Sequence, residues 1–483
     1  MSDVRLQESR QVFSGAALIG LAQLFQRGGG FLATFLAARI AGPAVFGQYV
    51  FAVSTVGMLA GYLGLGVAST AVRYGGQLGG GSPSGARVRR FIWIWTLTSG
   101  FAAAGLVYFF SGSVVSLLAI GDHAQILRFA APICIATLVF EVVWGSQLGA
   151  RSNRSLLLIG ATYGICMALF LPIGSTVDSS VMLLGHAIAL FISVVVGIEC
   201  SRRYSSRTNT AEAIGGNRPT HREMLRFGIS QIVSTLGIGV ASWWVVALIS
   251  RVDPSMKEVG AYGVATQLKA VAVFLPGIFV SQVMPMLASS TAESSARMRV
   301  LSNMLVYSGT TALIAAGCIL FILPQLITLY GPHYQHATTA IILLVACGAV
   351  QMSNGPMFQA VVLYRPVLSA LIAGVGAATL ATSATLLVPH FGAAGGGISW
   401  LVAESAGYWL SYLVVRRFEG GAAIRRSVVA VWLAIVVVTA AALCREWTAG
   451  SDWAGSIAIV LVTSLATLVF AYAFLKARRG GWA

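Results

Sequence analysis

The sequence predicts an all-α protein that crosses a membrane many times. Hydrophobic residues make up 57% of its 483 positions, and charged residues make up only 10%. A soluble domain of this size could not cover so much apolar surface. The apolar runs are also too long for strands, and they lack a sustained alternation of apolar and polar residues. These observations together define a polytopic helical membrane protein.

The apolar runs correspond to about fourteen transmembrane helices. Crossing the hydrocarbon core takes ~20 apolar residues in a helix. By that measure, helices are expected near residues 13–41, 48–75, 91–112, 124–149, 155–175, 180–200, 223–251, 259–287, 299–331, 336–361, 366–388, 394–415, 427–445 and 455–475. The first run is interpreted as a membrane helix rather than a signal peptide, because Asp3 and Glu8 precede it and another span follows directly.

The basic residues predict the orientation of these helices. When the loops are assigned to alternate sides, 24 arginines and lysines fall on one side and 5 on the other, while Arg27 and Lys269 remain inside spans. Cytoplasmic loops carry the excess of bases, so both termini are predicted to be cytoplasmic. The same distribution explains the net charge of +16 without a nucleic-acid partner.

A weak internal repeat indicates two parallel lobes of six helices each. The pattern Gly-x-Tyr-x-x-Ala at residues 47–52 returns 213 positions later, at residues 260–265. The longest polar connection follows the sixth helix and has the Gly and Pro content of a linker. Six helices return the chain to its starting side, so the lobes are related by an axis along the membrane normal. The predicted domains are an N-lobe at 1–200, a cytoplasmic linker at 201–222, a C-lobe at 223–416 and two C-terminal helices at 417–483.

Four ionisable residues lie near the middle of predicted spans: Arg27, Glu141, Lys269 and Glu404. A charge inside the membrane is expensive, so it marks a functional site or a pair. Each lobe holds one acid and one base, and one interpretation is a structural pair within each lobe. The other is that the bases face a water-filled space and bind an anionic group, for which arginine and lysine are natural ligands. The acids are candidates for ion coupling or for salt bridges.

The internal repeat favours the functional interpretation of the bases. At the 213-residue offset, Arg27 corresponds to Val240, and Lys269 corresponds to Val56. A charge that only the shared scaffold required should recur in both halves. Because neither base recurs, we expect both to contribute to substrate binding.

Amide side chains lie near both bases. Gln23 is four residues before Arg27 and shares its face of the helix. Gln267 is two residues before Lys269. Both glutamines are predicted to line the substrate site, although hydrogen bonds between packed helices account for such amides equally well.

The sequence contains no nucleophile motif, metal-ligand constellation or ATP site, so it predicts no catalytic residue, metal or cofactor. A proton or sodium gradient, or the flux of substrate, would then drive transport. The predicted external loops are too short for a catalytic domain, which argues against an enzyme. His186 is expected to be a hydrogen-bonded core residue. Trp400 either stacks on a sugar or belongs to an interfacial aromatic belt.

Three short motifs resemble the polysaccharide-transport branch of the MOP exporter superfamily. They are Ala-Arg-Ile-Ala-Gly-Pro-Ala-Val-Phe-Gly-Gln-Tyr at 38–49, Leu-Gly-Leu-Gly at 63–66 and Val-Gly-Ala-Tyr at 259–262. The resemblance implies a MATE-like fold with a V-shaped central cavity, located in the bacterial inner membrane. It also implies a flippase that moves undecaprenyl-pyrophosphate-linked oligosaccharide units to the periplasmic leaflet for O-antigen, capsule or exopolysaccharide synthesis.

The resemblance further implies partners and a binding mode. The partners would be the lipid-linked oligosaccharide, membrane lipids and polysaccharide polymerase or assembly proteins. In related lipid II flippases, bases on helices one, two and eight are thought to bind the pyrophosphate. Arg27 and Lys269 match that arrangement by helix rather than by motif. The alternative is a MATE-type ion-coupled exporter of small molecules, although a cation exporter would not favour two bases in its cavity.

Overall fold

The computed structural model is helical in every range that it describes, namely residues 2–78, 83–118, 123–150, 152–205, 220–289, 294–419 and 422–447. Two compact units make up the chain, Met1–Leu236 (unit 1) and Gly237–Ala483 (unit 2). Their boundary falls within one continuous helix, α7 (His221–Val252). Most of the predicted linker at 201–222 lies outside the described residues, so the domain bounds drawn from the sequence stay a prediction.

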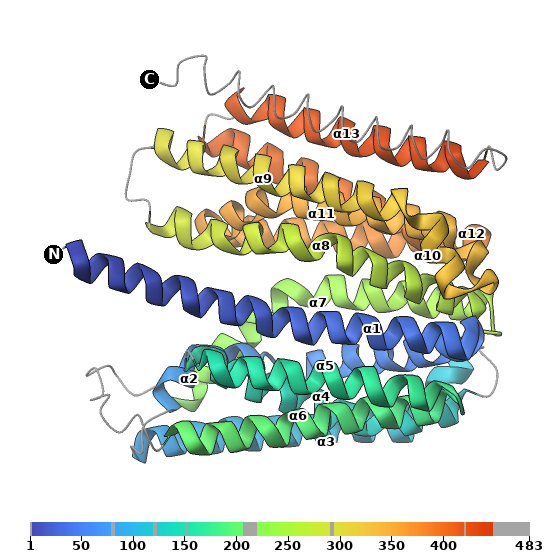
Figure 1. The fold of residues 1–483 in the computed structure, drawn as a ribbon, viewed down its shortest axis with the longest axis horizontal. Helices are drawn as coiled ribbons and strands as arrows, with labels where there is room; N and C mark the ends of the chain where they lie inside the picture. Colours follow the sequence, from blue (N-terminus) through green and yellow to red (C-terminus); the bar gives the residue numbers. More distant parts are fainter. Residues whose placement is uncertain are drawn as a thin grey trace. The chain divides into compact units, whose positions relative to one another are not determined.

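Unit 1 is built around the pairing of its first and fifth helices. Its helices are α1 (Ser2–Leu63), α2 (Val67–Leu78), α3 (Pro83–Leu118), α4 (Ala124–Gly149), α5 (Asn153–Ser175), α6 (Ser179–Ser205) and the first part of α7. α5 packs along α1 and α6, and α4 contacts α1, α2, α3 and α6. Figure 1 shows these helices in blue to green, running side by side.

Unit 2 surrounds a buried central helix. It contains the rest of α7, α8 (Lys257–Ser289), α9 (Ser294–Phe321), α10 (Leu323–Tyr330), the 3₁₀ turn η1 (Pro332–Ala337), α11 (Thr338–Tyr364), α12 (Pro366–Glu419) and α13 (Ala422–Trp447). Every residue from 340 to 350 of α11 is buried. This is because α8, α9, α12 and α13 all pack against α11.

Two glycine kinks lie inside long helices: α12 holds two predicted spans, and α1 holds the first predicted span and the start of the second. Within α1, Gly42 has φ 73° and ψ 172°, and Pro43 opens the next segment. Within α12, Gly392 has φ 54° and ψ −129°. Glycine adopts positive φ without steric penalty, and proline suits a first helical turn because its missing N–H would have no partner there. The connection expected at 42–47, between the first two predicted spans, is therefore a kink at one residue.

Two predicted spans are interrupted. The span expected at 48–75 breaks between α1 and α2, where Leu65 and Gly66 have φ 47° and 70°. A Cβ on Gly66 would lie 2.3 Å from the carbonyl oxygen of Gly228 on α7, so only glycine allows this approach. The span expected at 299–331 breaks between α9 and α10, where Pro324 lies in the first turn of α10.

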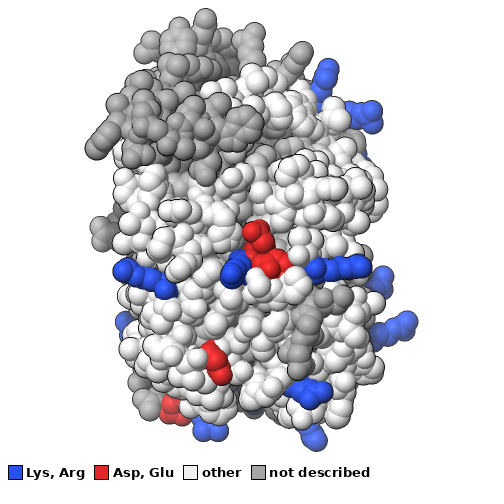
Figure 2. Space-filling view, turned by 90° about the vertical axis from the view of Figure 1, so that its right-hand side faces the viewer, with Lys and Arg blue, Asp and Glu red and all other residues white. Residues whose placement is uncertain are grey.

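The fold class predicted from the sequence is confirmed. Within the described ranges, nine helices are long and apolar enough to cross a membrane, and two of these are the kinked helices α1 and α12. The predicted fourteenth helix, 455–475, lies outside the described residues. Figure 2 shows one face of the molecule, on which charged side chains are sparse and uncharged residues cover most of the described surface.

Candidate functional site

A close crossing of α1 and α5 fixes the orientation of Arg27. A Cβ on Gly29 would lie 2.3 Å from Cα of Gly164, and one on Gly160 would lie 2.4 Å from the carbonyl oxygen of Ala22. Residues two apart on a helix point in different directions. Gly29 faces α5, so Arg27 points elsewhere and is exposed at the surface of unit 1.

The residues predicted to accompany Arg27 have different surroundings. Gln23 is half-buried and lies one turn before Arg27, on the same side of α1. Glu141 is exposed on α4. Among the described residues, no ion pair forms at Glu141. Roles for Gln23 in binding and for Glu141 in ion coupling stay predictions.

In unit 2, the structure places Lys269 against an aromatic ring. Lys269 is half-buried on α8, and its Nζ lies 4.1 Å from the ring centroid of Trp400 on α12. The indole Nε1–H of Trp400 donates a hydrogen bond of 2.7 Å to Oη of Tyr262. An ammonium over an indole face is a cation–π contact, and it is strongest where water is excluded. Trp400 is thus turned inward, toward Lys269.

Two further polar groups lie near Lys269. The thiol of Cys347 on α11 lies near enough to Lys269 to interact with it electrostatically. Glu404, one turn after Trp400 on α12, interacts electrostatically with Lys269. Within the described part of the chain, however, Lys269 and Glu404 form no direct ion pair. The structure brings these two predicted residues together, and it adds Trp400, Tyr262 and Cys347.

Gln267 lies on another side of α8 from Lys269. Its Oε1 accepts a hydrogen bond of 3.3 Å from Oη of Tyr330 on α10. The two-residue spacing explains the separation, because residues at i and i+2 do not share a helix face. A part for Gln267 in substrate binding stays a prediction.

The tyrosines of the internal repeat make corresponding contacts in the two units. In unit 1, Oη of Tyr49 lies 2.9 Å from Nδ1 of His186 on α6. In unit 2, Tyr262 bonds to Trp400 in the second half of α12. His186 is buried, so its prediction as a hydrogen-bonded core residue is confirmed. Sequence reasoning noted both tyrosines but not their partners.

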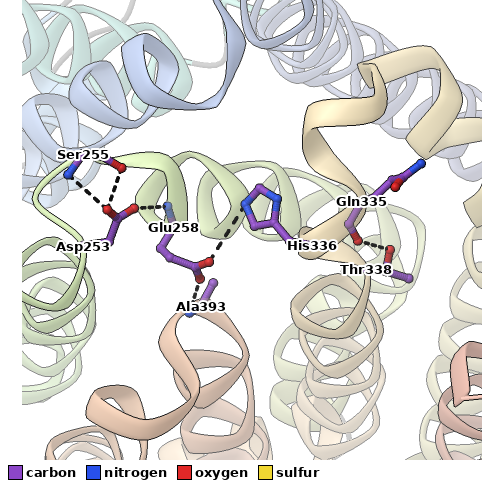
Figure 3. Close-up of polar contacts among 7 residues, drawn as sticks. All are labelled: Asp253, Ser255, Glu258, Gln335, His336, Thr338 and Ala393. Atoms are coloured by element: carbon purple, nitrogen blue, oxygen red, sulfur yellow. Dashed lines mark hydrogen bonds and ion pairs between the residues drawn. The ribbon is translucent and has the colours of Figure 1, made fainter.

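The sequence did not predict a second polar cluster in unit 2, which lies at the start of α8 (Figure 3). Oε2 of Glu258 accepts the backbone N–H of Ala393 at 2.9 Å, and Oε1 lies 4.0 Å from Nε2 of His336. Ala393 follows the kink at Gly392, so its N–H begins a helical segment and needs an external acceptor. Glu258 supplies that acceptor and joins α8 to α12.

Asp253 organises the start of α8 in the same cluster (Figure 3). Its Oδ1 accepts hydrogen bonds from N–H and Oγ–H of Ser255, at 3.0 and 2.6 Å, and its Oδ2 accepts the N–H of Glu258 at 2.9 Å. Partial burial tends to raise the pKa of Asp253, but these bonds outweigh it and lower the pKa below its ordinary value. An acidic residue just before a helix start is the sequence signal for this cap.

Comparison with known proteins shows which proteins share this fold. No family model matches the chain. The chain is 23% identical over 357 residues to the EPS I polysaccharide export inner membrane protein EpsE of Ralstonia nicotianae, covering 72% of this chain and 80% of that protein. The lipid II flippase MurJ in an inward closed conformation matches with TM-score 0.67 and 13% identity, over 95% of this chain and 99% of that one.

A second group of solved structures has the same fold. An inward-facing multidrug resistance MATE family transporter of the MOP superfamily matches with TM-score 0.56 and 14% identity, over 84% of this chain and 98% of that one. The resemblance to the MOP superfamily expected from the sequence is confirmed, and these identities establish the fold alone. Roles for the individual site residues remain predictions.

Proposed function

We propose that this chain, which has the fold of the MOP superfamily of transporters, is a flippase for lipid-linked polysaccharide precursors in the bacterial inner membrane. A relative is named as a polysaccharide export inner membrane protein, and one structural neighbour is named as a lipid II flippase. These proteins are transporters, which agrees with the absence of an enzyme motif in the sequence. The substrate would be an undecaprenyl-pyrophosphate-linked oligosaccharide repeat unit.

The observation that carries this proposal is the setting of Lys269. It is a base in an apolar helix, and it contacts the ring of Trp400 without forming an ion pair with the nearby acid Glu404. A base held in this way keeps its charge available for an anionic ligand. Arg27 supplies a second base in unit 1. Pyrophosphate is a fitting ligand for both bases. A guanidinium binds phosphate oxygens through two parallel hydrogen bonds, and an ammonium binds them as a point charge.

Transport proceeds by alternating access in this proposal. The bases bind the pyrophosphate on the cytoplasmic side, and the bound anion offsets the cost of moving two charges through the membrane. The substrate thereby favours the outward-open state, which releases the oligosaccharide to periplasmic polymerase or assembly proteins. Both termini and the 201–222 linker lie in the cytoplasm. Labelling of a cysteine placed in that linker by an impermeant reagent outside intact cells would contradict this orientation.

The main test compares three alanine variants in a host that lacks the chromosomal copy. Arg27→Ala and Lys269→Ala are each expected to lower export of the lipid-linked oligosaccharide by roughly 100-fold, as expected for loss of charged contacts worth about 3 kcal/mol. Lys257→Ala is the matched control, because Lys257 is exposed at the start of the same helix, α8. Arg27→Lys should retain partial activity, because the charge remains while the paired hydrogen bonds of the planar guanidinium are lost.

A double variant separates substrate binding from structural pairing. If Arg27 served only to neutralise Glu141, then Arg27→Ala combined with Glu141→Ala would restore export, because no uncompensated charge would remain. The proposal predicts no rescue. Lipid analysis of the deletion strain provides the second measurement, since undecaprenyl-pyrophosphate oligosaccharide should accumulate there.

The alternative is a MATE-type ion-coupled exporter of small molecules, which the fold likeness to MATE transporters allows. It predicts a deletion strain with normal lipid-linked intermediates and greater sensitivity to organic cations. It also predicts that Lys269→Ala would leave export intact or increase it, because a cation binds poorly beside an ammonium. The deletion-strain results or the Lys269→Ala result would each favour the small-molecule exporter over the flippase.

A further inference from the structure

The sequence uses lysine rarely, which makes Lys269 unusual among its bases. Of the 31 basic residues, only Lys257, Lys269 and Lys476 are lysines. The surroundings of Lys269 explain the choice. A Cβ on Gly348 of α11 would lie 3.3 Å from Cγ of Lys269, so the lysine stem runs closely along α11. A thin methylene chain and a compact ammonium suit this narrow path better than a planar guanidinium.

The ring that receives the ammonium is itself held in place. Tyr262 is almost fully buried, at 3% exposure. Its Oη accepts the indole N–H of Trp400 at 2.7 Å. A Cβ on Gly396, one turn before Trp400, would lie 3.1 Å from Cε2 of Tyr262, so the phenol ring packs directly on α12. Tyr262 therefore fixes the plane of the indole, and the indole fixes the position of Nζ of Lys269.

We infer that Trp400 and Tyr262 are positioning residues for substrate binding. They hold the Lys269 ammonium on the indole face in the empty protein and release it to the pyrophosphate of the incoming lipid. This inference rests on the proposed function. The exchange is favourable because a phosphate anion attracts an ammonium more strongly than an aromatic face does. Without the ring, the long lysine chain would sample many rotamers, and binding would have to order it.

A second tryptophan on α12 provides the contrast. Trp409 packs against Tyr408, Tyr412 and Trp432, at ring-centroid distances of 6.0, 6.0 and 5.7 Å. Among the described residues no cation lies over these rings, and the cluster joins α12 to α13. Trp409 thus fills a packing role on the helix where Trp400 contacts Lys269, and it serves as a matched control.

The small number of lysines permits a direct test. In a Lys257→Arg, Lys476→Arg background, Lys269 is the sole lysine of the full-length protein. Its labelling by a small water-soluble amine reagent is measured by mass spectrometry in nanodiscs. Trp400→Leu is expected to raise the labelling rate about fivefold, because the ring no longer holds the ammonium. Trp400→Phe retains a ring face but loses the N–H that Tyr262 accepts, so its labelling rate should lie between those of the parent and Trp400→Leu. Trp409→Leu should leave it unchanged.

Transport completes the test. Trp400→Leu should lower export of the lipid-linked oligosaccharide by about tenfold, as expected for an imprecisely placed charge. Trp400→Phe, which keeps a ring but loses the N–H that Tyr262 accepts, should lose less, and Trp409→Leu should export normally. Equal labelling rates in the parent and in Trp400→Leu would overturn the inference. Normal export by Trp400→Leu would also overturn it. Absence of labelling in every variant would show an amine closed off from water, which contradicts the release step.

Inorganic pyrophosphate separates this inference from the proposed function. It should protect Lys269 from labelling in the parent. If pyrophosphate gives no protection and Lys269→Ala exports normally, the proposed function fails even where Trp400 is shown to hold the lysine. If pyrophosphate protects but Trp400→Leu behaves as the parent, the positioning inference fails while the proposed function stands.

Discussion

The two units make the same kind of contact with different chemistry. In unit 1, Tyr49 contacts His186 in the buried core. In unit 2, the corresponding Tyr262 meets Trp400, whose other role is to receive the Lys269 ammonium. The position corresponding to Lys269 in unit 1 is Val56, which is fully buried. The repeat thus retains the tyrosine that packs the helices together, and at the position of Val56 and Lys269 it has a charge in unit 2 only.

The crossing of the first and fifth helices also differs between the units. In unit 1, Gly29 and Gly164 meet backbone to backbone. At the 213-residue offset, Gly164 corresponds to Ala377. In unit 2, a Cβ on Gly237 would lie 3.1 Å from Cβ of Ala377, which is a side-chain contact that a small shift can relieve. The unit that presents Arg27 therefore has the tighter crossing.

The largest predicted effect comes from breaking the tight crossing. Gly29→Ala would place a methyl group 2.3 Å from Cα of Gly164, closer than any real contact. Helix backbones that meet at small residues cannot absorb such overlap without separating. We expect a loss of about 3 kcal/mol or more in the free energy of unfolding. The measurement is the yield and thermal midpoint of the purified protein.

Neighbouring glycines supply the controls for that variant. Gly28 and Gly30 have nothing within 4 Å of a built Cβ, so Gly28→Ala and Gly30→Ala should be neutral or slightly stabilising, because alanine favours the helix. Gly237→Ala in unit 2 should cost at most about 1 kcal/mol. If Gly29→Ala were as stable as Gly30→Ala, the crossing would not determine the orientation of Arg27.

Local sequence patterns were enough to predict the helices, because hydropathy over a span of this length is a strong signal. They could not predict the break at Leu65 and Gly66, which depends on the approach of Gly228 from a distant helix. The same limit applies to the site. The depth of Lys269 was readable from the sequence, whereas its contact with Trp400 depends on how α8 and α12 pack. The separation of Gln267 from Lys269 was readable, since two residues along a helix change the face.

The next largest predicted effect distinguishes Tyr262 in unit 2 from Tyr49 in unit 1. Tyr262→Phe removes the acceptor for the Trp400 indole, so we expect export of the lipid-linked oligosaccharide to fall about threefold to tenfold, with a stability loss of about 1 kcal/mol. Tyr49→Phe removes the partner of His186 Nδ1, while Tyr163 still contacts the other ring nitrogen at 3.5 Å. It should cost a similar amount of stability, while export remains close to normal. Thermal midpoints and export are measured on the same preparations.

The test of that prediction is whether the two variants lose similar stability but different amounts of export. Equal loss of export in both variants would mean that the two contacts serve the scaffold alike. An unchanged export in Tyr262→Phe, with the expected stability loss, would show that the indole keeps its orientation without the hydroxyl.

The smallest effect concerns the caps that begin helices in the two units. Asp253 in unit 2 accepts three hydrogen bonds before α8, from N–H and Oγ–H of Ser255 and from N–H of Glu258. Asp178 in unit 1 accepts one backbone bond, from N–H of Val181 at 2.8 Å. A capping side chain contributes about 1 kcal/mol. Asp253→Asn is therefore expected to lower the free energy of unfolding by about that amount at neutral pH, and Asp178→Asn by less.

The pH dependence of the Asp253 cap sharpens this prediction. Burial tends to raise the pKa of Asp253, but the hydrogen bonds to the carboxylate prevail and lower it below the ordinary value of 3.8. A carboxyl group whose pKa is lower in the folded state contributes stability above its ordinary pKa, and that stability is lost as the pH falls through the lowered pKa. The difference in thermal midpoint between parent and Asp253→Asn should thus be constant from pH 7 to about pH 5 and shrink below about pH 4. A difference that persists unchanged to about pH 2, well below the ordinary pKa of an aspartate, would show that the shape of the cap matters and its charge does not.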